Sequence, residues 1–117
     1  MFSNLAIKPG AKVLELCCGD GFNAKYFYRY RAKEIHSCDF DNTAIIHANT
    51  HHKNFKTSFF CADIRYDMLE GKYDNIIWDA AIEYFTPQEI DDIMRNIKYR
   101  LGDNGIVYNG PIDLDHY

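Results

Sequence analysis

Residues 12–21 read KVLELCCGDG, and this stretch decides the fold. Its first five residues form a short, mostly apolar run, which is typical of a buried β-strand. Gly19 and Gly21 then interrupt the strand with residues that permit positive φ and let the backbone approach a ligand closely. Aromatic residues at helical spacing follow and predict a helix, namely Phe22, Tyr26, Phe27 and Tyr30. Taken alone, the glycine turn is also what a plain strand-to-helix connection requires.

The alternation of strand and helix continues along the chain. Further strands are predicted over Glu34–Cys38, Thr57–Cys61, Asp74–Trp78 and Gly105–Asn109. A helix is expected to begin near Asn42, where Asp41 can cap it. Residues 63–73 have only a weak helical pattern, so we expect a loop with at most one turn of helix there.

The clearest helix signal lies in the last third of the sequence. Thr86-Pro87-Gln88-Glu89 is a capping box with proline at the first helical position. An apolar stripe follows it, made of Ile90, Ile93, Met94, Ile97 and Leu101. Gly102 is expected to end this helix as a C-terminal glycine. Strands that alternate with helices predict an α/β fold, a three-layer sandwich around a mostly parallel five-stranded sheet.

Composition and charge bound the classes of function. The chain has 117 residues, 47% of them hydrophobic, and we expect one domain over residues 1–117. No run approaches the roughly 20 apolar residues of a membrane span, and no signal peptide is recognised, so we expect a cytoplasmic protein. Residues 63–117 hold five basic and twelve acidic side chains, which argues against a nucleic-acid interface there. Lys25–Lys33 mixes basic and aromatic residues, and an amphipathic helix with solvated cations explains it best.

Neither the cysteines nor the histidines form a metal-binding pattern. The four cysteines are Cys17, Cys18, Cys38 and Cys61, with no C-x-x-C pair. We expect reduced thiols at or near buried strand ends, with a reactive Cys17 or Cys18 as the alternative. His47 and His51 can share a helix face, but no acidic or cysteine partner lies nearby at zinc-site spacing. We therefore expect no metal.

Acidic residues follow the predicted strands, at the edge of a parallel sheet where ligands bind. Asp39 lies 20 residues after Gly19 and can accept both hydroxyl protons of a ribose. Because Asp41 already fills the capping role, Asp39 is expected to be freer for a ligand. Asp63 can accept from an adenine amino group, and Asp79 follows the fourth strand. An acid in a loop is common by itself. Acids that follow one predicted strand after another are much less expected by chance.

These motifs resemble the core of the class I S-adenosylmethionine-dependent methyltransferases. VLELCCGDG (13–21) resembles the family's first motif, and CDFD (38–41) resembles its acidic second strand end. CADI (61–64) resembles the adenine-side motif, and YDNIIWDAAIEYF (73–85) and LGDNGIVYNG (101–110) resemble the later segments. The similarity runs from about Lys8 to Gly110. It implies a Rossmann-like sheet of order 3-2-1-4-5 and S-adenosylmethionine as cofactor.

The resemblance also implies the site residues. The cofactor-binding residues would be Glu15, Cys17, Gly19, Gly21, Asp39, Phe40, Ala62, Asp63, Ile64 and Asp79. The catalytic candidates are Asp79, Glu83 and Tyr84. Asp79 would lie near the sulfonium and the acceptor, and Glu83 or Tyr84 could act as a base where the acceptor must lose a proton. Methyl transfer is an in-line displacement that depends mainly on alignment, and we expect a small-molecule acceptor.

Two departures from the family leave alternatives open. Cys17 replaces the first glycine of the motif, where we expect a mild effect because cysteine is small. The family's sheet usually has two further strands after the fifth, whereas only Pro111–Tyr117 remain here. We therefore expect a second copy or another chain to cover the edge of the fifth strand, or a deletion from a longer protein.

Two other functions fit parts of the pattern. Gly19–Ala24 satisfies G-x-G-x-x-A, and with Asp39 it also fits a nicotinamide-binding domain. The short chain also fits a non-catalytic binding or regulatory subunit that keeps the cofactor fold. Glu15, Asp63 and the fourth-strand segment argue against the nicotinamide-binding domain, whereas the non-catalytic subunit stays open and is distinguished by whether the chain transfers a methyl group.

Overall fold

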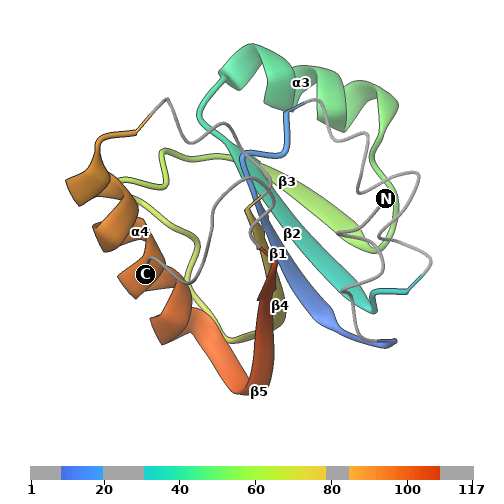
Figure 1. Cartoon of the computed structure of the whole chain (residues 1–117). Helices are drawn as coiled ribbons and strands as arrows, with labels where there is room; N and C mark the ends of the chain where they lie inside the picture. The colour runs from blue at the N-terminus through green and yellow to red at the C-terminus, as the bar shows by residue number, and fades with distance from the viewer. Residues whose placement is uncertain (1–8, 20–30, 79–84, 109–117) are drawn as a thin grey trace.

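The structure is a computed structural model that describes residues 9–19, 31–78 and 85–108. The helix expected over residues 22–30, with most of the basic-aromatic stretch Lys25–Lys33, lies outside these ranges. The described part of the chain forms a sheet with helices packed against it (Figure 1).

The sheet has five strands in the order β3-β2-β1-β4-β5. The strands are β1 (Lys12–Leu16), β2 (Glu34–Asp39), β3 (Thr57–Cys61), β4 (Tyr73–Trp78) and β5 (Leu101–Tyr108). All four strand pairings are parallel. The predicted α/β class, the parallel sheet and the strand order are therefore confirmed.

Two helices cover opposite faces of this sheet. Side chains of successive strand residues point to opposite faces, so Val13 and Leu14 of β1 enter different cores. Val13 packs with the buried residues of α3 (Asn42–His51), whereas Leu14 packs with those of α4 (Pro87–Arg100). Figure 1 shows the two helices on either side of the strands. The three-layer arrangement is thus present in the described residues.

Helix α3 begins where its cap predicts. The Asp41 carboxylate accepts from the backbone N–H of Thr43 at 2.9 Å and of Ala44 at 3.4 Å, which satisfies amides that the first turn leaves unpaired. Ile45 and Ala48 are the buried residues of this helix. They hold α3 against β2 and β3.

Helix α4 begins at the predicted capping box. Thr86 Oγ1 accepts from the Glu89 amide at 3.1 Å, and Glu89 Oε1 accepts from the Thr86 amide at 2.9 Å. Pro87 occupies the first turn, where a missing N–H costs no hydrogen bond. The buried stripe is as predicted for Ile90, Ile93, Met94 and Ile97, and it covers the β1–β4 part of the sheet.

The predicted end of α4 and start of the last strand are wrong. Leu101 has extended backbone (φ −75°, ψ 131°), so the helix stops before Gly102 is reached. Gly102 has no positive φ, and β5 begins at Leu101 instead of Gly105. Tyr73 pairs with Leu101 and Asn75 with Ile106, so β5 advances five residues while β4 advances two. The excess residues form a bulge in which Asn104 takes the left-handed conformation (φ 63°).

The remaining strand boundaries differ little from the prediction. The strand Thr57–Cys61 is confirmed, and β2 and β4 are each one residue longer than predicted. The segment between β3 and β4 is a loop, as expected. Arg100, which is 6% exposed, holds this loop to α4 by donating to the carbonyls of Leu69 (2.6 Å) and Met68 (3.1 Å). The Arg100 guanidinium thus links α4 to the loop between β3 and β4.

Candidate binding site

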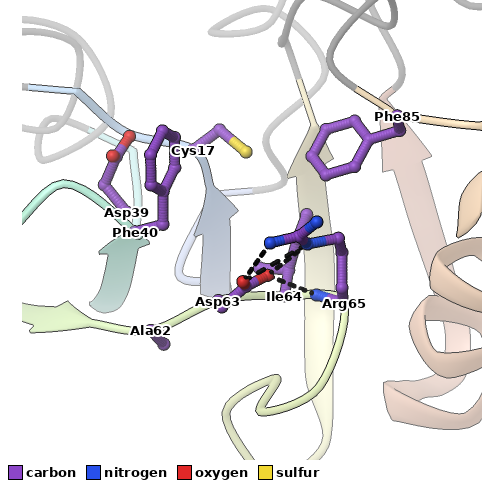
Figure 2. Close-up of a pocket in the computed structure, with 8 residues that line it drawn as sticks. All are labelled: Cys17, Asp39, Phe40, Ala62, Asp63, Ile64, Arg65 and Phe85. Atoms are coloured by element: carbon purple, nitrogen blue, oxygen red, sulfur yellow. Dashed lines mark hydrogen bonds and ion pairs between the residues drawn. The ribbon is translucent and has the colours of Figure 1, made fainter.

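A pocket lies at the carboxyl ends of β1, β2 and β3. Its cavity has a volume of about 140 Å³ and opens to solvent. The residues that line it are Cys17, Asp39, Phe40, Ala62, Asp63, Ile64, Arg65 and Phe85. Figure 2 shows that they come from the ends of neighbouring strands and from the start of the segment leading into α4. Six of these residues are among the predicted cofactor-binding residues.

Asp39 ends β2 and is buried, with 8% of its surface exposed. Its Oδ2 accepts from the Gly19 amide at 2.9 Å, and its Oδ1 accepts from the Asp41 amide at 2.9 Å. Asp39 is therefore engaged by two backbone amides, which the sequence did not predict, while Asp41 caps α3 as expected. The two amides fix the carboxylate at the base of the glycine turn.

Asp63 follows β3 and is held by the side chain two residues later. Arg65 Nη2 donates to Asp63 Oδ2 at 2.7 Å, and Arg65 Nε donates to Oδ1 at 3.0 Å. This guanidinium lowers the pKa of the Asp63 carboxyl. Asp63 is thus an ionised carboxylate paired with Arg65, a partner that the sequence did not predict.

Cys17 stands at the position of the motif's first glycine with φ 57°. This is the left-handed region, which glycine adopts without cost and other L-residues rarely adopt. The substitution therefore places strain in the turn, which the sequence analysis underestimated. Burial, with the nearby charge of Asp39, raises the pKa of the Cys17 thiol to about 12.

The four cysteines are all free. Cys18 and Cys38 are buried at strand ends as expected, whereas Cys61 is exposed, which contradicts the expectation for that residue. Burial raises the pKa of Cys18, and it raises the pKa of Cys38 to about 12. Protonated thiols are poor nucleophiles, so the alternative of a reactive Cys17 or Cys18 is not supported.

Apolar side chains form the flanks of the pocket. Phe40 is 69% exposed beside the carboxylate of Asp39. Ala62 and Ile64 are buried on the β3 side. Phe85 packs edge-on against Trp78, with ring centroids 5.6 Å apart. The pocket therefore combines an apolar slot with two fixed carboxylates.

Other predicted residues lie beside the pocket or outside the described residues. Glu15 is buried in β1, 3% exposed, and accepts from Ser37 Oγ of β2 at 3.0 Å, and it is not among the described residues that line the pocket. Gly19 supplies the amide that binds Asp39, with φ 59°. Gly21, Asp79, Glu83 and Tyr84 belong to the parts of the chain that the structure does not describe.

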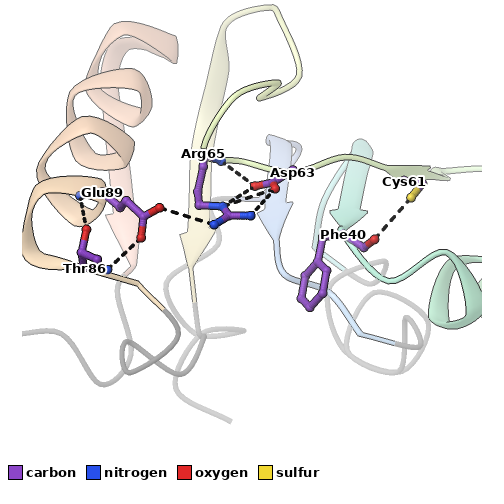
Figure 3. A network of polar contacts seen from close by, with 6 residues as sticks. All are labelled: Phe40, Cys61, Asp63, Arg65, Thr86 and Glu89. Atoms are coloured by element: carbon purple, nitrogen blue, oxygen red, sulfur yellow. Dashed lines mark hydrogen bonds and ion pairs between the residues drawn. The ribbon is translucent and has the colours of Figure 1, made fainter.

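Arg65 is the pocket residue that sequence reasoning missed. Figure 3 shows its guanidinium between Asp63 and Glu89, which lie on separate elements. Arg65 Nη1 lies 3.4 Å from Glu89 Oε2 at the first turn of α4. The only sign of this pair in the sequence is a basic residue two positions after the acid that follows β3. That spacing does not predict a contact, because the two side chains meet only if the backbone turns between them.

Metal binding and membrane insertion find no support in the described residues. His47 and His51 stack on α3 with centroids 4.4 Å apart. Across residues 9–19, 31–78 and 85–108, no group of three or more histidines, cysteines or acids is arranged to hold a metal ion. No helix within the same ranges is long and apolar enough to span a bilayer.

Comparison with curated proteins shows partial matches to methyltransferases. A malonyl-[acyl-carrier protein] O-methyltransferase of Bacillus anthracis is 30% identical over 97 residues, which are 82% of this chain and 35% of that protein. Juvenile hormone acid O-methyltransferase of Bombyx mori is 31% identical over 104 residues, 84% of this chain and 37% of that protein. The chain thus spans about a third of the length of these relatives.

Solved structures share the fold. A TehB-like SAM-dependent methyltransferase from Corynebacterium glutamicum has a TM-score of 0.75 at 21% identity, covering 89% of this chain and 56% of its own. A ribosomal protein L11 methylase from Lactobacillus delbrueckii has a TM-score of 0.73 at 19% identity, covering 92% and 55%. The model of the methyltransferase domain family matches residues 13–105. Because this match includes most of the sequence, the chain belongs to the methyltransferase domain family.

Proposed function

We propose that the chain binds S-adenosylmethionine in this pocket and acts as a methyltransferase on a small-molecule acceptor. The observation that carries the proposal is the buried Asp39 carboxylate, held by two amides at the carboxyl end of β2. Family membership and the apolar slot beside Asp39 support it.

The hydrogen-bonding capacity of Asp39 fits a ribose. A carboxylate has about four lone-pair sites, two on each oxygen. The amides of Gly19 and Asp41 take one site on each oxygen of Asp39. One site on each oxygen remains, and a ribose diol offers two hydroxyl donors. The backbone contacts therefore orient Asp39 for a diol without exhausting it.

The other end of the pocket fits a purine base. Phe40 and Ile64 flank the opening from the ends of β2 and β3 and supply apolar surface for a flat ring. Asp63 would accept from an exocyclic amino group of the base. Binding would also bury the exposed Phe40 ring, which contributes affinity through the apolar area removed from water.

The predicted roles at the methionine end remain proposals. Glu15, Gly19 and Gly21 would shape that end of the pocket around Cys17, and Asp79 would lie near the reacting atoms. The bound cofactor supplies an electrophilic methyl group. The chain would contribute alignment of the acceptor, and Glu83 or Tyr84 would take a proton from an acceptor that has to lose one.

Further proposals concern the acceptor, the location and the partner. The Bombyx mori relative is named for juvenile hormone acid, which supports a small-molecule acceptor for this chain; the Bacillus anthracis relative is named for a malonyl group on a carrier protein. Four free cysteines are consistent with the reducing cytoplasm.

Ile106 of β5 is 44% exposed at the sheet edge, which supports a second copy or another chain pairing there. A monomer at every concentration in analytical ultracentrifugation would contradict a second copy.

Calorimetric titration with S-adenosylhomocysteine, and with NADH in parallel, tests the function. Asp39→Asn keeps the size of the side chain but replaces one acceptor oxygen with a donor. We expect it to weaken nucleoside binding at least about tenfold, or ~1.4 kcal/mol. The control is Asp91→Asn, which changes an exposed carboxylate on α4. This variant should bind S-adenosylhomocysteine as tightly as the wild type does.

Each outcome of the titration decides between the functions. Binding of S-adenosylhomocysteine that depends on Asp39 supports the methyltransferase pocket. Binding of NADH alone favours the nicotinamide-binding alternative. A third outcome is that the chain binds S-adenosylhomocysteine but transfers no methyl group from S-adenosylmethionine to any of a panel of small carboxylic acids. This outcome favours a non-catalytic subunit.

A further inference from the structure

Arg65 and Asp63 form a tightly connected pair at the base-binding end of the pocket. Asp63 Oδ1 accepts from two donors of Arg65, the backbone N–H and Nε–H, both at 3.0 Å. Asp63 Oδ2 accepts from Arg65 Nη2 at 2.7 Å and, over a longer distance of 3.3 Å, from Arg65 Nε. The side chain and backbone of one residue thus hold both carboxylate oxygens.

This pairing limits what Asp63 can still accept. Each carboxylate oxygen has two lone-pair sites. Arg65 supplies two donors to Oδ1 at 3.0 Å, whereas Oδ2 accepts one short bond from Nη2 at 2.7 Å and only the longer share of Nε–H at 3.3 Å. The second site of Oδ2 is therefore engaged weakly and stays open to a stronger donor. Asp63 lines the pocket and its side chain is 34% exposed, so that remaining site is accessible to a ligand. Asp63 is therefore a carboxylate with one acceptor position left.

A second carboxylate braces the guanidinium from the other side. Arg65 Nη1 lies 3.4 Å from Glu89 Oε2, and the other oxygen of Glu89 accepts from the Thr86 amide at 2.9 Å. The Tyr66 ring lies against the same guanidinium, with its centroid 5.1 Å from Arg65 Cζ. Figure 3 shows the chain of contacts from the α4 cap through Arg65 to Asp63. The orientation of Asp63 thus depends on the first turn of α4.

We propose that Arg65 is a specificity-determining positioning residue: braced by Glu89, it leaves Asp63 one ionised acceptor site, which selects a base with an exocyclic amino group over one with a carbonyl. The inference rests on the proposed function, because it assigns the selectivity of the same pocket. An amino group donates to the remaining site of Asp63. A carbonyl at the same position of the base would place two acceptors face to face, which leaves both without a partner.

The guanidinium fork is needed for this role, and its charge alone is insufficient. Arginine presents its donors in a planar arrangement that matches a carboxylate, whereas lysine is a point charge on a flexible stem. A lysine at position 65 would keep a positive charge beside Asp63 without fixing both of its oxygens. Its removal to alanine would lose both effects.

The test compares S-adenosylhomocysteine with its 6-oxo counterpart, S-inosylhomocysteine, by calorimetry. We expect the wild type to prefer the amino compound by about tenfold or more, or ~1.4 kcal/mol. Arg65→Ala should reduce this ratio several-fold, and Arg65→Lys should restore it in part. Glu89→Gln keeps the capping box, since glutamine also serves at that position, and should give a smaller reduction by removing the brace.

A ligand-free measurement separates the inference from the proposed function. The pKa of the Asp63 carboxyl, followed by NMR, should rise in Arg65→Ala because the guanidinium no longer lowers it. The matched control is Arg95→Ala, which breaks the exposed pair with Asp92 on α4 at 2.9 Å. That variant should change neither the Asp63 titration nor the binding ratio.

The outcomes are distinguishable. A wild type that binds neither nucleoside contradicts the proposed function. A wild type that prefers the amino compound, with Arg65→Ala showing the same ratio as Arg95→Ala, overturns the role of Arg65 while the proposed function stands. Loss of the ratio in Arg65→Ala with partial rescue by Arg65→Lys supports both.

Discussion

Cys17 holds a left-handed backbone conformation at the turn that follows β1, with φ 57°. An L-residue pays about 1–2 kcal/mol for this conformation, and glycine does not. Cys17→Gly should therefore be more stable than Cys17→Ala by about 1 kcal/mol, although glycine gains more entropy on unfolding. Urea unfolding of the two variants measures the difference, and comparing them removes the contribution of the lost sulfur.

The adjacent cysteine provides the matched control. Cys18 does not have positive φ, so glycine has no conformational advantage there. Cys18→Gly should be less stable than Cys18→Ala, because glycine increases the entropy of the unfolded chain. If the glycine variant is the less stable one at both positions, the left-handed conformation of Cys17 is not a source of strain.

Single site residues show where sequence reasoning succeeds and where it does not. Asp39 and Asp63 could be placed at one edge, since parallel strands bring their carboxyl ends together. Their partners could not be foreseen. The Gly19 amide is 20 residues from Asp39, and Arg65 meets Asp63 only because residues 63–65 turn. Hydrogen bonds of this kind depend on loop geometry, which residue types alone do not specify.

At the scale of elements, the bulge of β5 depends on Gly105. A Cβ at this position would lie 3.0 Å from the Gly102 carbonyl oxygen and 3.0 Å from Leu101 Cδ2. Gly105→Ala should therefore destabilise the protein by about 1–3 kcal/mol, because the backbone has to shift to relieve the contact. Thermal unfolding followed by circular dichroism measures the loss.

Gly102 is the control for this substitution in the same strand. A Cβ there would meet its nearest neighbour, the Tyr73 carbonyl oxygen, at 3.6 Å, an ordinary contact. Gly102→Ala should change the stability by less than about 0.5 kcal/mol. Equal losses in the two variants would mean that the bulge is not responsible.

The two ends of α4 explain why its start was predictable and its end was not. A capping box satisfies the first amides of a helix with side chains that are visible in the sequence, Thr86 and Glu89. The end has more than one solution, because a helix can stop at a left-handed glycine or continue directly into a strand. Here the pairing of Leu101 with Tyr73 selects the second, and that pairing is a tertiary contact.

For the whole molecule, buried thiols make stability sensitive to alkaline pH. The pKa of Cys17 and of Cys38 is raised to about 12 from about 9. The unfolded chain therefore releases these protons at lower pH than the folded chain, so the free energy of unfolding should fall as pH rises from about 9 toward 12. By pH 10.5 each thiol contributes at most about 2 kcal/mol of this loss.

Urea unfolding at pH 8 and pH 10.5 measures the decline. Cys38→Ala removes one buried thiol with little change in volume and should make the decline shallower. Cys61→Ala removes an exposed thiol and should leave it unchanged. A decline of the same steepness in all three proteins would show that Cys38 does not contribute to it.

The parallel sheet has a consequence for how the chain is synthesised. β1 is the first described strand, and it lies in the middle of the sheet between β2 and β4. Val13 pairs with Ile35 on one side but waits for Asn75 on the other, 62 residues later in the sequence. While the ribosome adds those residues, the apolar central strand has one open edge. The nascent chain therefore depends on rapid closure by β4, or on a chaperone, to avoid pairing with its neighbours.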